Sequence, residues 1–387
     1  MSAPPQRMAR ILFVNTQGEI AGAERSLLLL MSRLAPRHEI TVACPAPSAL
    51  DEAVRENGCA RRVLALPRAR RLSSIPGAAY WLRSSMRVMA AASRVRADLI
   101  HANNLHSAAV SVPAAAFGRA GLVWHARDAA GAARLSRIIG RLSVRVIAVS
   151  NWVRERIVAQ GVDARKVVVV HNGVEDVAPG GATPAARETA SRTPFVFANV
   201  AQFVPWKKQA LFLAAAVRVA REMPHARFWL VGDDVFRRNA LYAGRLRRRV
   251  EKDDLSGRVV FTGWRRDMAA VYARIDCLVH AADAEPFGRV LIEAMAAGVP
   301  VIAVNAAGPA EIVIDGVTGI LVPPDDPAAM AAAMLRIAAD RRLAARLSAS
   351  AREDVARRFA AQLAAERVER IYGELLPGGL IAAVGTP

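Results

Sequence analysis

The sequence predicts two α/β domains in tandem, each built on a parallel sheet with a Rossmann-like order of elements. The chain has 387 residues, which is too long for one ordinary core and suits two domains of about 150 to 200 residues each. Short apolar runs alternate with helical patterns, as they do in parallel sheets that are covered on both faces. The alternation stops at a stretch rich in Ala, Pro, Gly and Thr and then begins again, so we expect a linker there.

The first domain is predicted to span 1–176. It opens with a short apolar strand over 10–15, a loop that contains glycines, and a helix in which leucines recur at helical spacing. Further strands are predicted over 39–43, 98–101, 121–125, 144–149 and 166–170.

The second domain is predicted to follow the linker 177–193 and to span 194–365. Its strands are expected over 195–200, 227–231, 258–262, 277–280, 299–304 and 319–322. An amphipathic helical tail over 327–376 is expected to cap this domain, with 366–387 as a C-terminal helix and tail.

The net charge of +19 raises the question of an anionic partner. Only four of the 53 basic residues are lysines, a composition that indicates coding bias toward Arg. Aromatic residues make up 5% of the chain, and no basic stretch interleaves with them as proteins that bind single strands require. We therefore expect no nucleic-acid partner, while an anionic membrane surface remains an alternative.

The cysteines and the apolar runs indicate a cytoplasmic protein. Three cysteines without metal-ligand spacing are typical of free buried thiols in a reducing compartment, so neither a metal site nor a disulfide is expected. No run reaches the roughly 18 to 20 uncharged apolar residues that span a bilayer, and 1–10 lacks the apolar core of a secretory signal.

The strongest functional motif follows the predicted strand 277–280. Glu285 and Glu293 stand eight residues apart, and a helix that begins at Gly288 would direct its amide groups toward an anion such as a diphosphate. In a helix these carboxylates are about 12 Å apart, whereas a retaining glycosidase holds its pair at about 5 Å. Each glutamate therefore holds a different part of one long ligand, unless Glu285 only caps the helix and Glu293 points to solvent.

With these residues the chain resembles the retaining glycosyltransferases of family 4, which have the GT-B fold of two Rossmann-like domains with a cleft between them. The resemblance runs from Gly18 to about Asp326 and includes several motifs in the family's order. The two glutamates match the family's pair, 201–208 matches its second-domain phosphate loop, and 149–152 and 171–174 match the end of its first domain.

The resemblance implies a role for each matched residue. Glu293 takes the ribose hydroxyls of a nucleoside diphospho-sugar, and Glu285 lies near the donor sugar and the reacting centre. Lys207 neutralises the departing diphosphate, so no metal ion or other cofactor is required. The turn whose backbone amides meet sugar hydroxyls and phosphate oxygens consists of Phe287, Gly288, Arg289 and Val290.

The phosphate loop departs from the family's pattern. Where the family has Gly-Arg-Leu before the lysine, this chain has Ala-Gln-Phe, so the neutral amide of Gln202 replaces the second cation. Lys208 or Arg289 would have to supply the missing charge.

The first domain also carries matched residues. The family's Gly-Gly-Ala-Glu is Ala-Gly-Ala-Glu here, which leaves Gly18 and Gly22 as the flexible points of the loop that lies against the donor phosphate. His125 ends a predicted strand and matches the family histidine that faces the transferred sugar, although a structural histidine at a strand end is the alternative. For His101, which ends another strand, we favour the structural interpretation.

Glycines after strands mark the expected nucleoside loops of the second domain. Gly232 follows one predicted strand, and Gly263 with Trp264 follows the next, as in the family's loops that contact the base through backbone groups. Without the resemblance, ordinary turns would be the preferred interpretation.

Together, these expectations describe an enzyme that transfers a hexosyl unit from a nucleoside diphospho-sugar to an acceptor hydroxyl, with retention of the anomeric configuration. The expected route is a same-face displacement through an oxocarbenium-like ion pair. A nucleotide-sugar epimerase and a non-catalytic nucleotide-sugar-binding protein are alternatives. A nicotinamide-dependent oxidoreductase would need a Gly-x-Gly-x-x-Gly turn, which the loop 18–22 lacks.

The basic, amphipathic segment 67–87 is a candidate surface for the acceptor. It contacts a membrane or a lipid-linked acceptor, unless it is a solvated helix. We expect a glycan or lipid-linked acceptor in cell-envelope polysaccharide or glycolipid synthesis. Peripheral contact with the inner face of the membrane is the alternative to a purely cytoplasmic protein.

Overall fold

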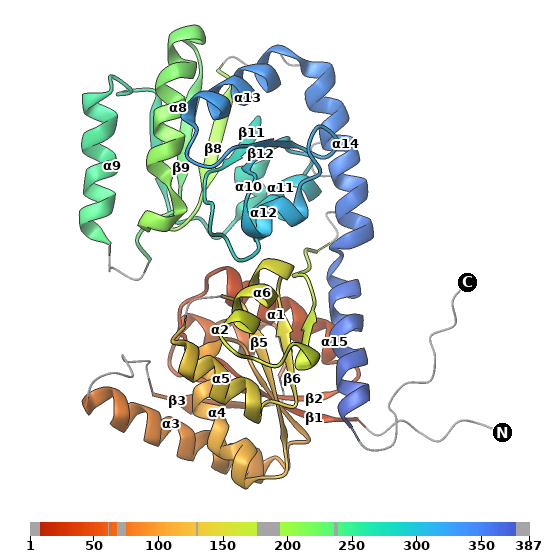
Figure 1. Cartoon of the computed structure of the whole chain (residues 1–387). Helices are drawn as coiled ribbons and strands as arrows, with labels where there is room; N and C mark the ends of the chain where they lie inside the picture. The colour runs from red at the N-terminus through yellow and green to blue at the C-terminus, as the bar shows by residue number, and fades with distance from the viewer. Residues whose placement is uncertain are drawn as a thin grey trace, which may run out of the picture. The chain divides into compact units, whose positions relative to one another are not determined.

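The computed structural model of the chain describes residues 8–60, 62–67, 75–128, 131–175, 194–235 and 239–376 (Figure 1). The chain divides into two compact units. The first runs to Glu175 and resumes at Ala361, and the second spans Asp176–Ala360. The predicted linker, 177–193, lies outside the described residues.

The first unit contains a seven-stranded parallel sheet in its described residues. The strands stand in the order β3-β2-β1-β4-β5-β6-β7. Their bounds are β1 (Arg10–Val14), β2 (Glu39–Pro45), β3 (Arg62–Leu66), β4 (Leu99–Ala102), β5 (Gly121–Ala126), β6 (Arg145–Ala148) and β7 (Val167–Val169). Every predicted strand of this domain is confirmed, and β3 was missed.

The strand order of this sheet changes direction between β1 and β4. Ligands of open α/β sheets bind at such a switch point, outside the carboxyl ends of the strands. The loops that begin at Asn15 and Asn103 therefore lie where a ligand site is expected.

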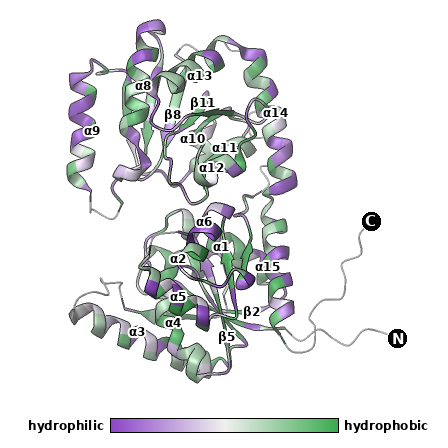
Figure 2. Ribbon diagram, in the orientation of Figure 1, coloured by the Kyte–Doolittle hydropathy of each residue, from purple (hydrophilic) through white to green (hydrophobic). Residues whose placement is uncertain are grey.

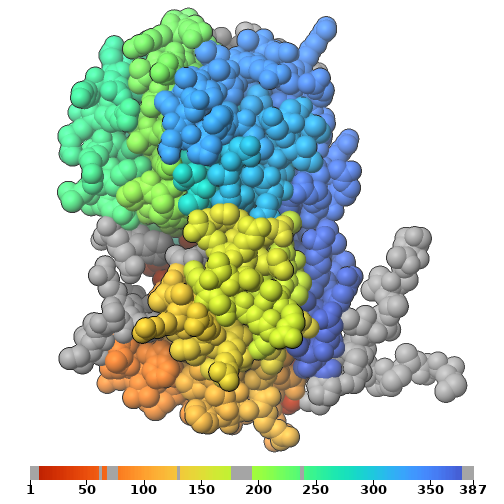
Figure 3. All heavy atoms as spheres, in the orientation of Figure 1, coloured from red at the N-terminus to blue at the C-terminus, as the bar shows by residue number. Residues whose placement is uncertain are grey.

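Helices cover both faces of the first sheet. One hydrophobic cluster joins Ile11 and Phe13 of β1 to Leu27, Leu50 and Tyr372 of three different helices. The neighbouring strand residues are also buried, because successive side chains of a strand alternate between faces, and α3, α4 and α5 cover that second face. Figure 2 shows the labelled strands as mainly green, and Figure 3 shows little of the red N-terminal segment on the face that it draws. The helices are α1 (Gly22–Leu34), α2 (Ala49–Glu56), α3 (Ile75–Arg94), α4 (Leu105–Phe117), α5 (Ala133–Leu142), α6 (Asn151–Ala159) and α15 (Ala361–Leu375).

The helical tail corrects one expectation, because it does not cap the second domain along its whole length. α13 (Pro327–Ala339) and α14 (Arg341–Arg358) belong to the second unit, but α15 belongs to the first, where it packs against α1. Ion pairs from Arg37 to Glu369, 2.9 Å, and from Arg145 to Glu374, 3.2 Å, hold it there. The amphipathic pattern shows that a helix buries one face, but not which sheet receives that face.

The second unit contains a six-stranded parallel sheet in its described residues, in the order β10-β9-β8-β11-β12-β13. Its strands are β8 (Val196–Val200), β9 (Arg227–Val231), β10 (Val259–Gly263), β11 (Cys277–His280), β12 (Val301–Val304) and β13 (Ile320–Val322), and all were predicted. The order changes direction between β8 and β11, so a second switch point lies there.

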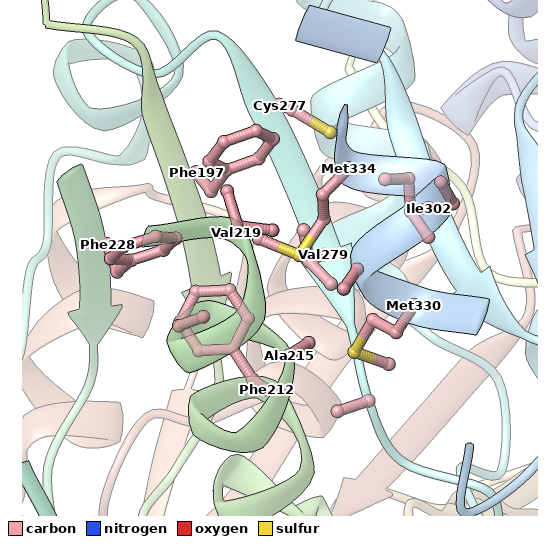
Figure 4. Close-up of a cluster of buried hydrophobic side chains, with 14 of the residues drawn as sticks. Phe197, Phe212, Ala215, Val219, Phe228, Cys277, Val279, Ile302, Met330 and Met334 are labelled. Atoms are coloured by element: carbon pink, nitrogen blue, oxygen red, sulfur yellow. The ribbon is translucent and has the colours of Figure 1, made fainter. Parts of the chain in front are cut away.

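Aromatic and sulfur-containing side chains fill the core on one face of this sheet (Figure 4). The Phe197 and Phe228 rings stack with centroids 6.0 Å apart, and Met330 and Met334 of α13 pack in the same cluster. Each such buried side chain contributes about 1.5 to 3 kcal/mol. The helices of this unit also include α8 (Gln209–Glu222), α9 (Ala240–Lys252), α10 (Met268–Tyr272), α11 (Arg289–Ala296) and α12 (Ala307–Ile312).

The three cysteines are buried and free, as predicted. Burial raises the pKa of the Cys44 thiol to about 12, so this thiol is unreactive at neutral pH. Among the helices described here, none is both long enough and apolar enough to cross a bilayer.

Candidate functional site

Lys207 and Glu285 meet at the switch point of the second sheet. Lys207 ends a short 3₁₀ turn after β8, and Glu285 lies in the loop after β11. The Nζ atom of Lys207 donates a hydrogen bond to Oε2 of Glu285. Their side chains are only 16% and 11% exposed, so the ion pair is well shielded from solvent. Two residues that the sequence predicted to act on one ligand are therefore in direct contact.

Glu285 is ionised in this arrangement. Burial raises the pKa of its carboxyl, but the charge of Lys207 and the hydrogen bond from His280 outweigh burial and hold the pKa at about 2. Nε2 of His280 lies 3.3 Å from the same carboxylate oxygen, and an ionised carboxylate only accepts, so this nitrogen is the donor. Sequence reasoning missed His280, although a histidine at the end of a buried strand, five residues before Glu285, was a usable signal.

Lys208 joins three loops of the second sheet. Its Nζ atom lies 2.5 Å from Asp283 after β11 and 2.8 Å from Asp325 after β13. Desolvation lowers the pKa of Lys208, but its hydrogen bonds to the two carboxylates raise the pKa above the ordinary value overall. The cation that was expected to replace the missing arginine is therefore held by carboxylates that the sequence analysis did not single out.

Gly288 forms the turn that starts α11, as predicted. Its φ angle is +103°, a left-handed conformation that side chains with a Cβ atom rarely adopt. A Cβ atom at this position would lie 3.7 Å from Cγ of Glu285, so the turn directly adjoins the ion pair. Phe287 anchors the turn, since its ring is buried and lies 5.9 Å from that of Phe359. The first turn of α11 thus begins beside Lys207 and Glu285.

Glu293 does not point freely into solvent, so the solvated alternative is wrong. Its side chain is 12% exposed and accepts hydrogen bonds from Nε of Arg289, 2.6 Å, and from the hydroxyl of Tyr272, 2.9 Å. The same hydroxyl lies 3.5 Å from the carbonyl oxygen of Val290. Arg289 is therefore also held by a carboxylate.

The expected nucleoside loops of the second unit are joined to each other. The amide of Gly232 donates to the carbonyl of Gly263, 3.1 Å, and Trp264 is partly exposed beside them. Gly232 has a φ angle of +143°, and a Cβ atom there would lie 1.9 Å from the carbonyl oxygen of Ala201. Glycine is therefore required for this loop to approach the phosphate loop. Within that loop, the Gln202 carbonyl accepts from Nε2 of Gln209, 2.7 Å.

Gly18 lies within the loop after β1, and Gly22 follows that loop. The Gly18 carbonyl accepts from the amide of Leu50, 2.9 Å, and Gly22 begins α1. Glu24 closes the loop, since its carboxylate accepts from the amide of Ala21, 3.1 Å. Burial raises the pKa of Glu24, and the hydrogen bonds that it accepts oppose that effect.

His125 lies in a buried hydrogen-bonded cluster of the first unit. Its Nδ1 atom is 3.1 Å from Nε2 of His101, whose Nδ1 atom is 2.6 Å from the hydroxyl of Tyr372 in α15. Arg127 also approaches Nδ1 of His125, at 3.4 Å. His101 is therefore part of the same cluster as His125, and Tyr372 is a residue that sequence reasoning missed because it lies 271 positions away.

Arg127 connects this cluster by hydrogen bonds to the switch point of the first sheet. Its guanidinium donates to the side-chain oxygens of Asn103, 2.5 Å, and Asn172, 2.6 Å. Asn103 in turn donates to the side-chain oxygen of Asn15, 2.9 Å. The loops after β1, β4 and β5 are thereby connected. Arginine two positions after a histidine that ends a strand was the available signal.

The structure groups the predicted site residues by unit. The second unit holds Lys207, Lys208, Gln202, Gly232, Gly263, Trp264, Glu285, Phe287, Gly288, Arg289, Val290 and Glu293, and the first holds Gly18, Gly22 and His125. In the part of the chain that the structure describes, no group of three or more His, Cys, Asp or Glu side chains is arranged to hold a metal ion.

Two family models match the chain, one in each unit. The model described as Glycosyltransferase Family 4 matches residues 20–177, and the one described as Glycosyl transferases group 1 matches residues 194–340.

Curated relatives are similar over part of their length. A lipopolysaccharide core biosynthesis glycosyltransferase, LpsE of Rhizobium meliloti, is 29% identical over 54% of this chain and 55% of its own. A phosphatidyl-myo-inositol mannosyltransferase of Mycolicibacterium smegmatis is 32% identical over 63% of this chain and 59% of its own. The chain thus spans a little over half the length of these two relatives.

Solved structures share the fold over nearly the whole chain. Anabaena HepE in complex with UDP-glucose superimposes with a TM-score of 0.82 at 25% identity, covering 94% of this chain and 99% of that one. A sucrose-phosphate synthase of Thermosynechococcus elongatus, at 22% identity and a TM-score of 0.79, covers 95% of this chain and 99% of its own. The chain therefore has the predicted GT-B fold, with two Rossmann-like α/β units.

Proposed function

Since the chain belongs to the group 1 glycosyl transferases of family 4, we propose that it transfers a hexosyl unit from a nucleoside diphospho-sugar to an acceptor hydroxyl, with retention of configuration. The observation that carries the proposal is the shielded ion pair of Lys207 and Glu285 beside the Gly288 turn, at the switch point of the second sheet.

Lys207 supplies the positive charge that the leaving group needs. When the bond between the sugar C1 and the phosphate oxygen breaks, negative charge develops on the diphosphate, and a preorganised ammonium stabilises that charge most in a site shielded from water. A diphosphate competes with Glu285 for this ammonium, while the first turn of α11 offers amide donors. In this proposal a metal ion is not required.

Glu285 supplies the negative charge that the sugar needs. Its pKa of about 2 keeps it ionised, so it stabilises the oxocarbenium character of C1 in the transition state. The acceptor oxygen then bonds to C1 on the face that the phosphate leaves, and the departing phosphate takes the acceptor's proton. Glu293, whose carboxylate is already oriented by Arg289 and Tyr272, accepts hydrogen bonds from the ribose hydroxyls.

The first test is a panel of diphospho-sugars. We expect one nucleotide to raise the melting temperature and to be released during transfer, and UDP-hexoses come first because HepE, a structural relative, was solved with UDP-glucose. Retention is read from the anomeric configuration of the product. A donor converted to an altered sugar without an acceptor would indicate an epimerase, and binding without turnover would indicate a non-catalytic protein.

For the acceptor, we propose a lipid-linked glycan at an anionic membrane surface. α3 carries no acidic residue, and its exposed face presents Leu82, Met86 and Met89 together with Arg83 and Arg87. Apolar side chains between arginines are the pattern of a helix that lies in a lipid interface. Segment 68–74, which completes the predicted basic region, lies outside the described residues.

Vesicle sedimentation at low salt tests this acceptor surface. We expect the protein to bind phosphatidylglycerol vesicles and not phosphatidylcholine vesicles, and Arg83→Ser with Arg87→Ser to abolish binding. The matched control is Arg245→Ser with Arg248→Ser on α9, which removes the same charge from exposed positions of the second unit. Equal loss in both double variants, or no binding by the unaltered protein, would contradict the membrane proposal.

A further inference from the structure

A chain of hydrogen bonds connects the C-terminal helix α15 to His125. The hydroxyl of Tyr372 lies 2.6 Å from Nδ1 of His101, and Nε2 of His101 lies 3.1 Å from Nδ1 of His125. Tyr372 and His101 are fully buried, and His125 is 3% exposed. Each of these bonds needs one donor and one acceptor, so the position of a single proton determines the direction of the whole chain.

Donors at both ends of the chain, Arg127 and the hydroxyl of Tyr372, favour one direction. Its guanidinium can only donate, and its Nη2 atom lies 3.4 Å from Nδ1 of His125. Nδ1 of His125 therefore accepts and carries no proton, Nε2 of His101 donates to it, and the hydroxyl of Tyr372 donates to Nδ1 of His101. The reverse direction would place an N–H group of His125 against the guanidinium and leave the Tyr372 hydroxyl proton without a partner among the described residues.

Both histidines are neutral at physiological pH. Burial, together with the charge of Arg127, lowers the pKa of His101 to about 3 and the pKa of His125 well below its ordinary value. A neutral His125 without a proton on Nδ1 carries it on Nε2. This Nε2 atom is buried and has no hydrogen-bond partner within the described part of the chain. Because buried donors are nearly always paired, an unpaired one in a candidate site is suited to a ligand oxygen.

We propose that Tyr372 is a positioning residue, which acts through His101 to hold His125 in the tautomer that donates from Nε2. The proposal rests on the proposed function and on the expectation from the sequence that His125 faces the transferred sugar. It adds that His125 donates a hydrogen bond to a sugar oxygen and takes no proton from the acceptor. It also gives α15 a function beyond covering the first sheet.

The test combines histidine ¹⁵N spectra of the full chain with transfer kinetics. In the unaltered protein we expect both His101 and His125 to carry their proton on Nε2. Tyr372→Phe keeps the ring but removes the donor, so Nδ1 of His101 can take up a proton and Nε2 can lose one. We expect His125 then to populate the other tautomer and the donor KM to rise about 10-fold, with a smaller change in kcat. His101→Phe should have the same effect, and the double variant should be no worse, because both changes break one chain.

Glu369→Gln is the matched control for loosening α15. Glu369 lies one helical turn before Tyr372 and pairs with Arg37 at 2.9 Å, outside the hydrogen-bonded chain. We expect this variant to lower the melting temperature without changing the tautomer of His125 or the donor KM.

Either of two results would overturn the proposal: a proton on Nδ1 of His125 in the unaltered protein, or an unchanged tautomer and KM in Tyr372→Phe. A different result would separate the two proposals. If the tautomers respond as described but no donor binds or reacts, the proposed function and the contact of His125 with a sugar are contradicted. The positioning of His125 by Tyr372 is then still supported.

Discussion

Lys207 donates a hydrogen bond to Glu285 across 78 positions of sequence. The parallel sheet makes this contact possible, because β8 and β11 are neighbours and their carboxyl ends open at the same edge. Lys208 repeats the arrangement with Asp283 at 2.5 Å, so two successive lysines of one loop face two carboxylates of another. Opposite charges thus lie close together, as the proposed separation of a cationic sugar from an anionic diphosphate requires.

Lys207→Ala removes the ammonium and leaves the shielded carboxylate of Glu285 without its ion-pair partner, although the hydrogen bond from His280 remains. We expect kcat to fall about 10² to 10³-fold, as when one preorganised donor to a developing oxyanion is lost. Transfer is measured by release of the nucleoside diphosphate, with circular dichroism to check the fold. Lys252→Ala, at an exposed position of α9, is the control and should retain full activity. Activity of Lys207→Ala within threefold of the unaltered protein would contradict the role of this lysine.

Glu285→Gln tests the pKa of the carboxyl. The pKa of Glu285 in the folded protein is about 2, below the ordinary 4.5, so its ionised form stabilises the fold. This contribution is complete above about pH 4.5, declines as the pH falls below that value and is gone below about pH 2, and its size is about 3 kcal/mol. Urea unfolding of both proteins between pH 7 and pH 3 measures it. We expect their difference in unfolding free energy to shrink only in the acid range, and a difference that already changes between pH 7 and pH 5 would argue against the low pKa.

Gly288→Ala separates backbone strain from function. Gly288 and Gly316 both have positive φ angles, +103° and +68°, so alanine should cost each about 1 to 2 kcal/mol. Gly316 lies in the turn before β13, and a Cβ atom there meets nothing within 4 Å. We therefore expect a loss of stability from both variants, larger for Gly288→Ala because its Cβ atom would also lie 3.1 Å from Cδ1 of Leu291, but a loss of donor binding only from Gly288→Ala. Thermal unfolding and donor titration measure the two effects, and equal donor affinity in both variants would show that the Gly288 turn does not touch the donor.

Most of the fold was predictable because its strands are short apolar runs that end at turn residues. The strand β3, Arg62–Leu66, was missed although residues 63–66 are a continuous apolar run, so the sequence did carry a signal for this edge strand. The position of α15 was not predictable, because Tyr372 packs against residues such as Phe13 that are hundreds of positions away.

The same distinction applies to the candidate site. Glu285 and Lys207 could be identified because each follows an apolar strand within a recognisable motif. Other contacts of the site could not be identified. Lys208 pairs with Asp283 and Asp325, and Tyr272 donates a hydrogen bond to Glu293. These contacts depend on which elements become neighbours in the fold. Sequence predicts which residues end a strand, whereas contacts between loops depend on which strands become neighbours.

Glu293→Gln, together with Tyr272→Phe, tests how the ribose is held. Each oxygen of Glu293 accepts one protein hydrogen bond, from Arg289 at 2.6 Å and from Tyr272 at 2.9 Å, and retains a second lone pair for a ribose hydroxyl. The amide in Glu293→Gln loses one acceptor and its charge, so we expect the donor KM to rise about 10-fold or more while kcat changes less. Tyr272→Phe removes only one of the two hydrogen bonds that orient the Glu293 carboxylate, so the donor KM of this variant should rise less than that of Glu293→Gln. Initial rates over a range of donor concentrations distinguish the two, and a drop in kcat at unchanged KM in Glu293→Gln would instead assign this carboxylate to the chemical step.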